Sequence, residues 1–271
     1  MGFFGRLKTG WNLAKDSMHV LREEPSLTIF PLLSGIFGLI FMAALFGGTY
    51  VTMGLEEGPV LYAVLFVLYF GSTFIASFFN AALVHNAREV FHGDDPTLGE
   101  GMRAAWSHRR ALAIWSLVAA TIGMILRAIE GSDNPLAEIA AMIFSVAWGI
   151  LTYFIVPVIV FEDVGPTEMF KRSGETFKST WGETAGAGFG VGIVTALFAI
   201  VGLGLAVGVF FLFGAGTFGI VGGVAVGAVV LLGAYLFGSA LGYIARTALY
   251  VYATENEQPE AFRNVDFSRT H

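Results

Sequence analysis

Cysteine is absent from this chain of 271 residues, and charge is scarce, since only 13 % of the residues are Asp, Glu, Lys or Arg. Without cysteine there is no disulfide framework, no thiol nucleophile and no thiolate metal site. A soluble domain carries about 25 % charged residues. The missing charge corresponds to long apolar runs, and this composition is typical of an integral membrane protein.

Motifs for catalysis and for cofactor binding are lacking as well. Glycine-rich runs such as residues 214–216 have no Lys-Ser or Lys-Thr after them, so they are not phosphate-binding loops. No arrangement of Ser, His and Asp indicates hydrolysis, and a capped turn is a simpler interpretation of residues 92–95 (His-Gly-Asp-Asp) than a cation site. We therefore expect no enzyme, no cofactor, no metal and no nucleic-acid partner. The histidines, which lack metal-ligand spacing along a helix, are His19, His85, His92, His108 and His271.

Six apolar runs each have roughly the 20 residues that a helix needs to cross a bilayer. The sequence therefore predicts an all-α polytopic membrane protein in the cell membrane, and Pro157 is expected to kink the fourth span. Only Gly214-Ala215-Gly216 separates the last two spans, so a tight hairpin and a re-entrant pair both fit. The predicted spans are residues 27–52, 59–85, 111–129, 135–161, 184–213 and 217–252.

Basic residues alternate from side to side of these spans. Because Lys and Arg beside a span are retained in the cytoplasm, both termini are predicted to be cytoplasmic. Arg127 is the exception, at the outer edge of the third span, where we expect an ion pair with Glu138 or with Glu130. The fourteen inside bases are Arg6, Lys8, Lys15, Arg22, Arg88, Arg103, Arg109, Arg110, Lys171, Arg172, Lys178, Arg246, Arg263 and Arg269.

An amphipathic helix is predicted before each pair of spans, because apolar residues recur there at spacings of three and four beside the bases. The second and third of these helices open with Pro-Thr, which suits a helix start. The fold is then three hairpins, each with its own interfacial helix, in one membrane domain. The units, about 1–92, 93–161 and 162–253 with a tail at 254–271, form a possible parallel threefold repeat. The alternative is that the chain has no repeat, because any polytopic protein has basic loops beside its spans.

Tryptophan and basic residues on these helices predict adhesion to anionic lipid of the inner leaflet, at about 1 kcal/mol per nearby base. The alternative is packing against the protein's own span ends, and we expect a mixture of the two. The candidate lipid-contacting residues are Trp11, Lys15, Trp106, Arg109, Arg110, Lys171, Arg172, Lys178 and Trp181.

Polar and small residues mark two further faces. Ser72, Thr73, Ser77 and Asn80 form a polar track on the second span, which predicts hydrogen bonds between helices or, alternatively, a water-lined path. Of the 35 glycines, 17 lie between residues 182 and 242. Many of these are four residues apart, and that spacing lets helices approach closely in lipid. It predicts either tight packing of the fifth and sixth spans within the monomer or a homo-oligomer interface.

The fourth loop has the most distinctive sequence. An apolar run containing Pro157 ends in Glu162-Asp163, followed by Lys171-Arg172-Ser173 and by Trp-Gly-Glu at 181–183. This pattern resembles a family of uncharacterised prokaryotic six-span membrane proteins that is well represented in archaea. More loosely, it is similar to the membrane domain attached to some glycerophosphodiester phosphodiesterases. The resemblance implies a topology and no reaction, because these residues hold no counterpart of the catalytic phosphodiesterase domain.

Taken together, these patterns predict a non-enzymatic membrane protein that organises lipids or partner proteins at the inner leaflet. This prediction rests on two observations. Amphipathic helices are repeated along the chain, and the spans have almost no ionisable residues at depth, where a proton-coupled transporter would need them. Two alternatives stay open. One is a channel or facilitator for a small solute or lipid, and the other is an accessory subunit of a membrane complex.

Overall fold

The computed structural model describes residues 3–53, 58–130, 134–214, 216–255 and 259–262. For residues 3–9, 52–53, 130, 181–187 and 189 it describes the backbone and not the side chains. Within these ranges every regular element is a helix, so the all-α fold class is confirmed. Six of the helical segments are long and apolar enough to cross a bilayer, as predicted.

The helices divide into two compact units, Met1–Pro31 with Thr180–His271 and Leu32–Ser179. The first half of the chain contains α1 (Phe3–Glu23), the 3-10 helix η1 (Pro25–Thr28), α2 (Ile29–Met53), α3 (Pro59–Phe91), α4 (Leu98–Ser107) and α5 (Arg109–Glu130). The second half contains α6 (Pro135–Thr152), α7 (Ile155–Phe161), α8 (Pro166–Ser179), α9 (Trp181–Phe213), α10 (Thr217–Glu255) and the 3-10 helix η2 (Glu260–Phe262).

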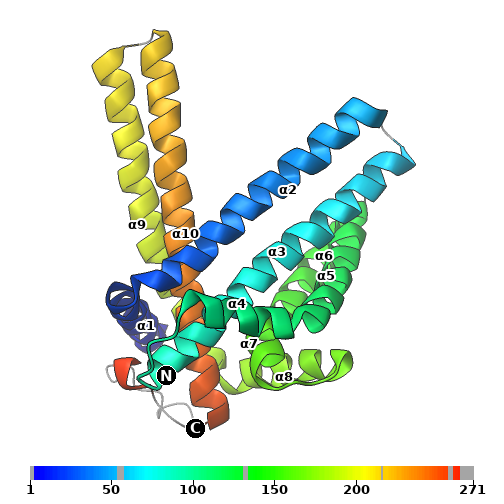
Figure 1. Ribbon diagram of the computed structural model, residues 1–271, viewed down its shortest axis with the longest axis vertical. Helices are drawn as coiled ribbons and strands as arrows, with labels where there is room; N and C mark the ends of the chain where they lie inside the picture. Colours follow the sequence, from blue (N-terminus) through cyan, green and yellow to red (C-terminus); the bar gives the residue numbers. More distant parts are fainter. Residues whose placement is uncertain (1–2, 54–57, 131–133, 215, 256–258, 263–271) are drawn as a thin grey trace. The chain divides into compact units, whose positions relative to one another are not determined.

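In the unit that joins the two ends of the chain, α9 and α10 pack side by side (Figure 1). Glycine makes this approach possible, because a Cβ atom added at Gly202 would collide with Val230. One added at Gly227 would lie 3.2 Å from the Cβ of Ala206. The tight packing predicted for the two glycine-rich spans is therefore present, and each of these spans is a continuous helix.

Helix α1 packs on α9 and α10 in the same unit. A Cβ atom at Gly190 of α9 would collide with the Gly10 carbonyl, so the two backbones touch there. The buried face of α1 includes Leu13, Ser17 and Val20. The apolar stripe predicted for this helix includes Trp11, Ala14 and Leu21, of which Ala14 and Leu21 are buried and Trp11 is exposed. Packing of this stripe on protein is thus observed at two positions, and its adhesion to lipid stays a prediction.

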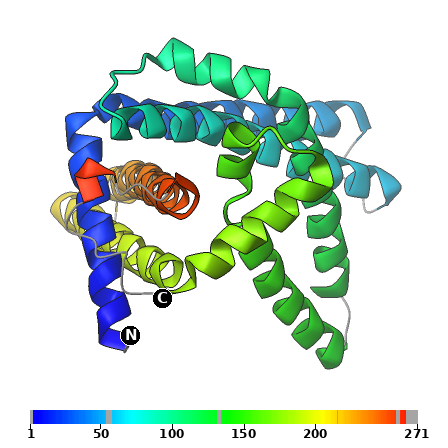
Figure 2. The same ribbon diagram turned by 90° about the horizontal axis from the view of Figure 1, so that it is seen from below.

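In the other unit, α3 supports α4 and α5. The indole Nε1 of Trp115 on α5 donates to the Ser77 hydroxyl on α3 at 3.0 Å, and both side chains are buried. The amide nitrogen of Asn86, near the end of α3, donates to the Thr97 carbonyl at 3.0 Å. These bonds hold α5 against α3 and hold the start of α4 against the end of α3, so that α4 runs beside α3 (Figure 2).

The fourth span is broken into α6 and α7, as predicted from Pro157. Proline has no N–H, and its ring clashes with the carbonyl four residues earlier, which here belongs to Tyr153. The helix ends at Thr152 and restarts at Ile155. The freed N–H of Phe154 donates to the buried hydroxyl of Ser173 on α8 at 3.0 Å. The break is thus closed by a side chain from the next helix.

Candidate functional site

A tryptophan and an arginine form the corner between α4 and α5, which only His108 separates. The side chain of Trp106 is 61 % exposed, at the end of α4. The guanidinium carbon of Arg109 lies 5.2 Å from its ring centroid, and Nη1 of Arg109 donates to the Trp106 carbonyl at 2.9 Å. Arg109 therefore makes a cation–π contact and also caps a carbonyl in the last turn of α4.

Two more arginines flank this pair. Arg103 and Arg110 are exposed, and no acidic residue occurs in the sequence between Glu100 and Glu130. Among the described side chains, neither arginine has an ion-pair partner. We name Arg103, Trp106, Arg109 and Arg110 the basic corner. It is a patch of three cations with one acid nearby, Glu100, whose pKa the charge of Arg103 helps to lower.

The start of α4 is acidic. The Glu100 carboxylate accepts hydrogen bonds from the Thr97 amide at 2.7 Å and from the Thr97 hydroxyl at 2.9 Å. These two bonds, the backbone one first, lower the pKa of the Glu100 carboxyl. In return the Glu100 amide donates to the Thr97 hydroxyl at 3.3 Å, which completes a capping box. Glu100 in the first turn of α4 also complements the dipole of this helix.

A hollow of about 370 Å³ lies beside this acidic start. Its acidic lining repels anions. The turn expected at residues 92–95 is present, with Gly93 at φ 89°. No group of three or more His, Asp or Glu side chains suited to a metal occurs in the ranges that the structure describes. The hollow is lined by His85, Glu89, Asp94, Asp95, Pro96 and Glu100.

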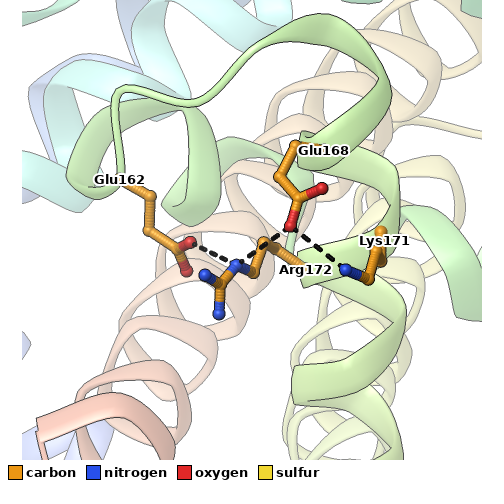
Figure 3. A network of polar contacts seen from close by, with 4 residues as sticks. All are labelled: Glu162, Glu168, Lys171 and Arg172. Carbon is orange, nitrogen blue, oxygen red and sulfur yellow. Dashed lines mark hydrogen bonds and ion pairs between the residues drawn. The ribbon is translucent and has the colours of Figure 1, made fainter.

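The bases of α8 are in a different electrostatic setting. Nε of Arg172 lies 3.4 Å from Oε2 of Glu162 and 3.4 Å from Oε1 of Glu168, and Nζ of Lys171 lies 3.5 Å from the same Glu168 oxygen (Figure 3). Lys178 is exposed. Residues 162–178 contain three bases and four acids. The surface of α8 is therefore charged without being net basic.

Helix α1 carries a second pair of tryptophan and cation. Nζ of Lys15 lies 5.5 Å from the ring centroid of Trp11, whose side chain is 37 % exposed. Trp181, which was expected on the stripe of α8, is instead the first residue of α9, and its side chain lies outside the part that the structure describes.

The polar track on α3 is partly used for helix packing. Ser77 accepts from Trp115, Asn80 is buried, and Ser72 and Thr73 are half-buried. Interhelical bonding is thus observed at Ser77, and a water-lined path stays a prediction for the other three positions.

Arg127 lies in the last turn of α5, and Glu138 lies in the first turn of α6. Both side chains are exposed, and no ion pair joins them in the described ranges. The side chain of Glu130 is outside those ranges. The predicted pairing stays a prediction.

Sequence reasoning missed the aromatic cluster that joins α5, α6 and α8. The rings of Trp115 and Trp148 stack at a centroid distance of 5.9 Å, and Phe170 lies 6.0 Å and 5.7 Å from them. Each ring alone is indistinguishable from a lipid-facing aromatic residue in the sequence. The only available signal was that Phe170 falls on the apolar stripe of its helix, which predicts contact without naming a partner.

The six apolar helices and their exposed apolar faces define a multi-pass integral membrane protein. The chain belongs to a family of unknown function (DUF6159), whose sequence model matches residues 59–259. The resemblance to an uncharacterised membrane family is confirmed to that extent. No curated protein and no solved structure matches the chain. The looser likeness to the membrane domain of glycerophosphodiester phosphodiesterases and the archaeal source stay predictions.

Proposed function

We propose that this protein is non-enzymatic, that both of its termini are cytoplasmic, and that α1, α4 and α8 lie at the inner leaflet and gather anionic lipid around the spans. The observation that carries the proposal is Arg109 held over the exposed ring of Trp106. Tryptophan concentrates at the boundary between lipid and water. A cation fixed on such a ring is placed where lipid phosphates lie, and nearby bases attract anionic lipid.

Exposed apolar side chains on the long helices support a position within the bilayer. Phe218 on α10 is 87 % exposed and Leu212 on α9 is 82 % exposed, and many neighbours on both helices are apolar and exposed as well. Soluble proteins rarely expose apolar patches of this extent. In a bilayer these apolar surfaces would contact the acyl chains and need no protein partner. The charged faces of α4 and α8 would then contact the lipid headgroups.

The test is the composition of the lipid that the protein retains. The full chain would be reconstituted in bilayers of mixed zwitterionic and anionic phospholipid and extracted in mild detergent, and the retained lipids would be quantified by mass spectrometry. We expect the ratio of anionic to zwitterionic lipid to exceed that of the starting bilayer. It should fall toward the bilayer value when the bases at the cytoplasmic end of the spans are all changed to glutamine, namely Arg103, Arg109, Arg110, Lys171, Arg172 and Lys178.

The control is Arg127→Gln, which removes a base at the opposite end of α5 and is expected to keep the ratio. Wild-type protein that retains lipid in the proportions of the bilayer would contradict the proposal. Solute flux through protein-containing liposomes would favour the channel interpretation instead. A second protein that remains bound after mild extraction would favour the accessory-subunit interpretation.

A further inference from the structure

We infer that the basic corner binds the phosphate of an anionic phospholipid, and that the acyl chains of this lipid lie along the outer face of α5. This inference rests on the proposed function, and it assigns most of the preference for anionic lipid to one of the three basic regions.

The first support is the preorganisation of Arg109. Its guanidinium is fixed at both the Trp106 ring and the Trp106 carbonyl. Of the five N–H donors of an arginine, the carbonyl uses one. The planar fork of the remaining donors suits bidentate binding of phosphate. Because the side chain is already held in place, binding costs less conformational entropy than it would for a free arginine.

The second support is the charge balance. Residues 98–110, which contain the basic corner, have three arginines and one acid, Glu100, whereas residues 162–178 have three bases and four acids. Lys171 and Arg172 are already paired with glutamates. Residues 1–24, which contain α1, have four bases and three acids. Uncompensated positive charge is therefore concentrated at the corner.

The third support is an apolar track that starts at the corner and identifies the occupant as a lipid rather than free phosphate. Arg110, Ile114, Leu117 and Ile125 follow one another at helical spacing on α5, so they share one face. The side chains of Ile114, Leu117 and Ile125 are 39 %, 48 % and 50 % exposed. Thr121 lies on the same face, but its hydroxyl donates to the Leu117 carbonyl at 2.9 Å and needs no water. A headgroup at Arg110 would thus continue into acyl chains along apolar side chains.

The depth of the corner in the bilayer agrees with this placement. The Trp106 ring meets the ring of Phe78 edge-on, at a centroid distance of 6.3 Å. Phe78 lies within the membrane-spanning part of α3, whereas Arg109 is the first residue of α5. The corner therefore reaches from the apolar part of one span to the charged end of the next, which is the level of the glycerol and phosphate groups.

The experiment compares two full-length variants that each lose three positive charges. In the first, Arg103, Arg109 and Arg110 become glutamine, and in the second, Lys171, Arg172 and Lys178 become glutamine. We expect the ratio of anionic to zwitterionic retained lipid to fall by about threefold or more in the corner variant. The α8 variant should lose less than about 1.5-fold, because Lys171 and Arg172 are already paired with glutamates.

Equal losses in the two variants, or a larger loss in the α8 variant, would overturn the inference while leaving the proposed function in place. If the wild-type protein shows no preference for anionic lipid, the proposed function itself fails. Circular dichroism and gel filtration would check that both variants fold. The variant R103K/R109K/R110K keeps the charge without the planar fork, and it should show an intermediate ratio.

Two further arms separate a lipid from free phosphate. Inorganic phosphate should displace a short-chain anionic lipid no better than chloride at equal ionic strength. Leu117→Asn, which leaves every arginine in place, should weaken retention of the anionic lipid because the acyl track becomes polar. Displacement by inorganic phosphate together with full retention in Leu117→Asn would show a phosphate site and not a lipid site.

Discussion

At Ser173 a single hydroxyl accepts a hydrogen bond from a backbone amide that lies at the break between α6 and α7. The Phe154 N–H and the Ser173 side chain are both in buried residues. Changing Ser173 to alanine leaves that N–H without a partner, which costs about 1–3 kcal/mol. We expect a corresponding loss in the free energy of unfolding, measured by denaturant titration in detergent micelles. Ser179→Ala in the same helix is the control, because its exposed hydroxyl bonds only within α8, and an equal loss there would contradict this role of Ser173.

At the start of α4, Thr97 and Glu100 make the stability of that helix depend on pH. The pKa of Glu100 is lowered in the folded protein from its ordinary value of 4.5, so its contribution is complete above that pH. It is lost as the pH falls through the folded-state pKa, because protonation disfavours the bonds that the carboxylate accepts from Thr97. We expect amide hydrogen exchange in α4, corrected for the intrinsic pH dependence, to lose protection below pH 4.5, and Glu100→Gln to remove this response.

Thr97→Ala should destabilise α4 at every pH by about 1 kcal/mol through loss of the N-cap. It should also shift the acid response toward that of an ordinary glutamate. The shift should be partial, because the backbone amide of residue 97 still donates to Glu100. An unchanged acid response in this variant would mean that the bond from the Thr97 hydroxyl does not help to lower the pKa of Glu100.

Thr97 and Ser173 differ in how well the sequence alone predicts their roles. The Pro-Thr pair at residues 96–97 predicts a helix start with a threonine cap, and Thr97 is the N-cap of α4. At the third predicted helix the same reasoning was only half right, because Pro166 is the first residue of α8 and Thr167 lies inside it. The role of Ser173 could not be predicted, because its partner is the Phe154 N–H, 19 residues earlier in the sequence. That N–H is available for a side chain because the helix is broken there.

At the scale of the element, glycines on α9 have two different surroundings. A Cβ atom at Gly202 would collide with Val230 of α10, whereas one at Gly204 would meet nothing within 4 Å. We expect Gly202→Ala to destabilise the pairing of α9 with α10 by about 1–3 kcal/mol, as overpacking does. Gly204→Ala should be neutral or stabilising by up to about 1 kcal/mol, because alanine is the better helix former. Thermal unfolding of both variants in one detergent measures the difference, and a stabilised Gly202→Ala would contradict the packing.

Helix ends were predicted less well than the spans themselves, for a physical reason. The second span was expected to end at His85, yet α3 continues to Phe91. Hydropathy detects where side chains leave the lipid, but a helix continues until its backbone hydrogen bonding is interrupted. Arg88 contacts the ring of Phe161, with its guanidinium carbon 5.0 Å from the centroid, so these last turns are packed on protein.

At the scale of the whole molecule, the absence of cysteine gives a direct test of orientation. Asp95 precedes α4, Glu138 is in the first turn of α6, and both are exposed. Single cysteines would be introduced at these positions. A membrane-impermeant maleimide added to intact cells should label the protein with Glu138→Cys, and label Asp95→Cys only after permeabilisation. The opposite pattern would reverse the predicted topology.

The grouping of helices into units was beyond the sequence. The contacts of α1 with α9 and α10 join segments more than 150 residues apart, and all three have apolar or glycine-rich faces that would suit many partners. The same limit applies to the basic corner. The bases on the three helices look equivalent in the sequence. In the structure they differ, because Arg172 pairs with Glu162, which precedes its own helix, while Arg109 lies over the ring of Trp106. The internal threefold repeat stays a prediction.

The positions of two arginines on α5 have a consequence for the lipid matrix. Arg109 and Arg127 are eighteen residues apart near opposite ends of this helix, which corresponds to about 27 Å at 1.5 Å per residue. The hydrocarbon core of a typical bilayer is about 30 Å thick. A longer helix such as α10 can tilt to fit a thinner membrane, but α5 cannot lengthen without drawing a charge into hydrocarbon. In the proposed placement, hydrophobic mismatch at α5 favours slightly thinner bilayers, and acyl-chain length would then act together with headgroup charge in selecting the lipids around this protein.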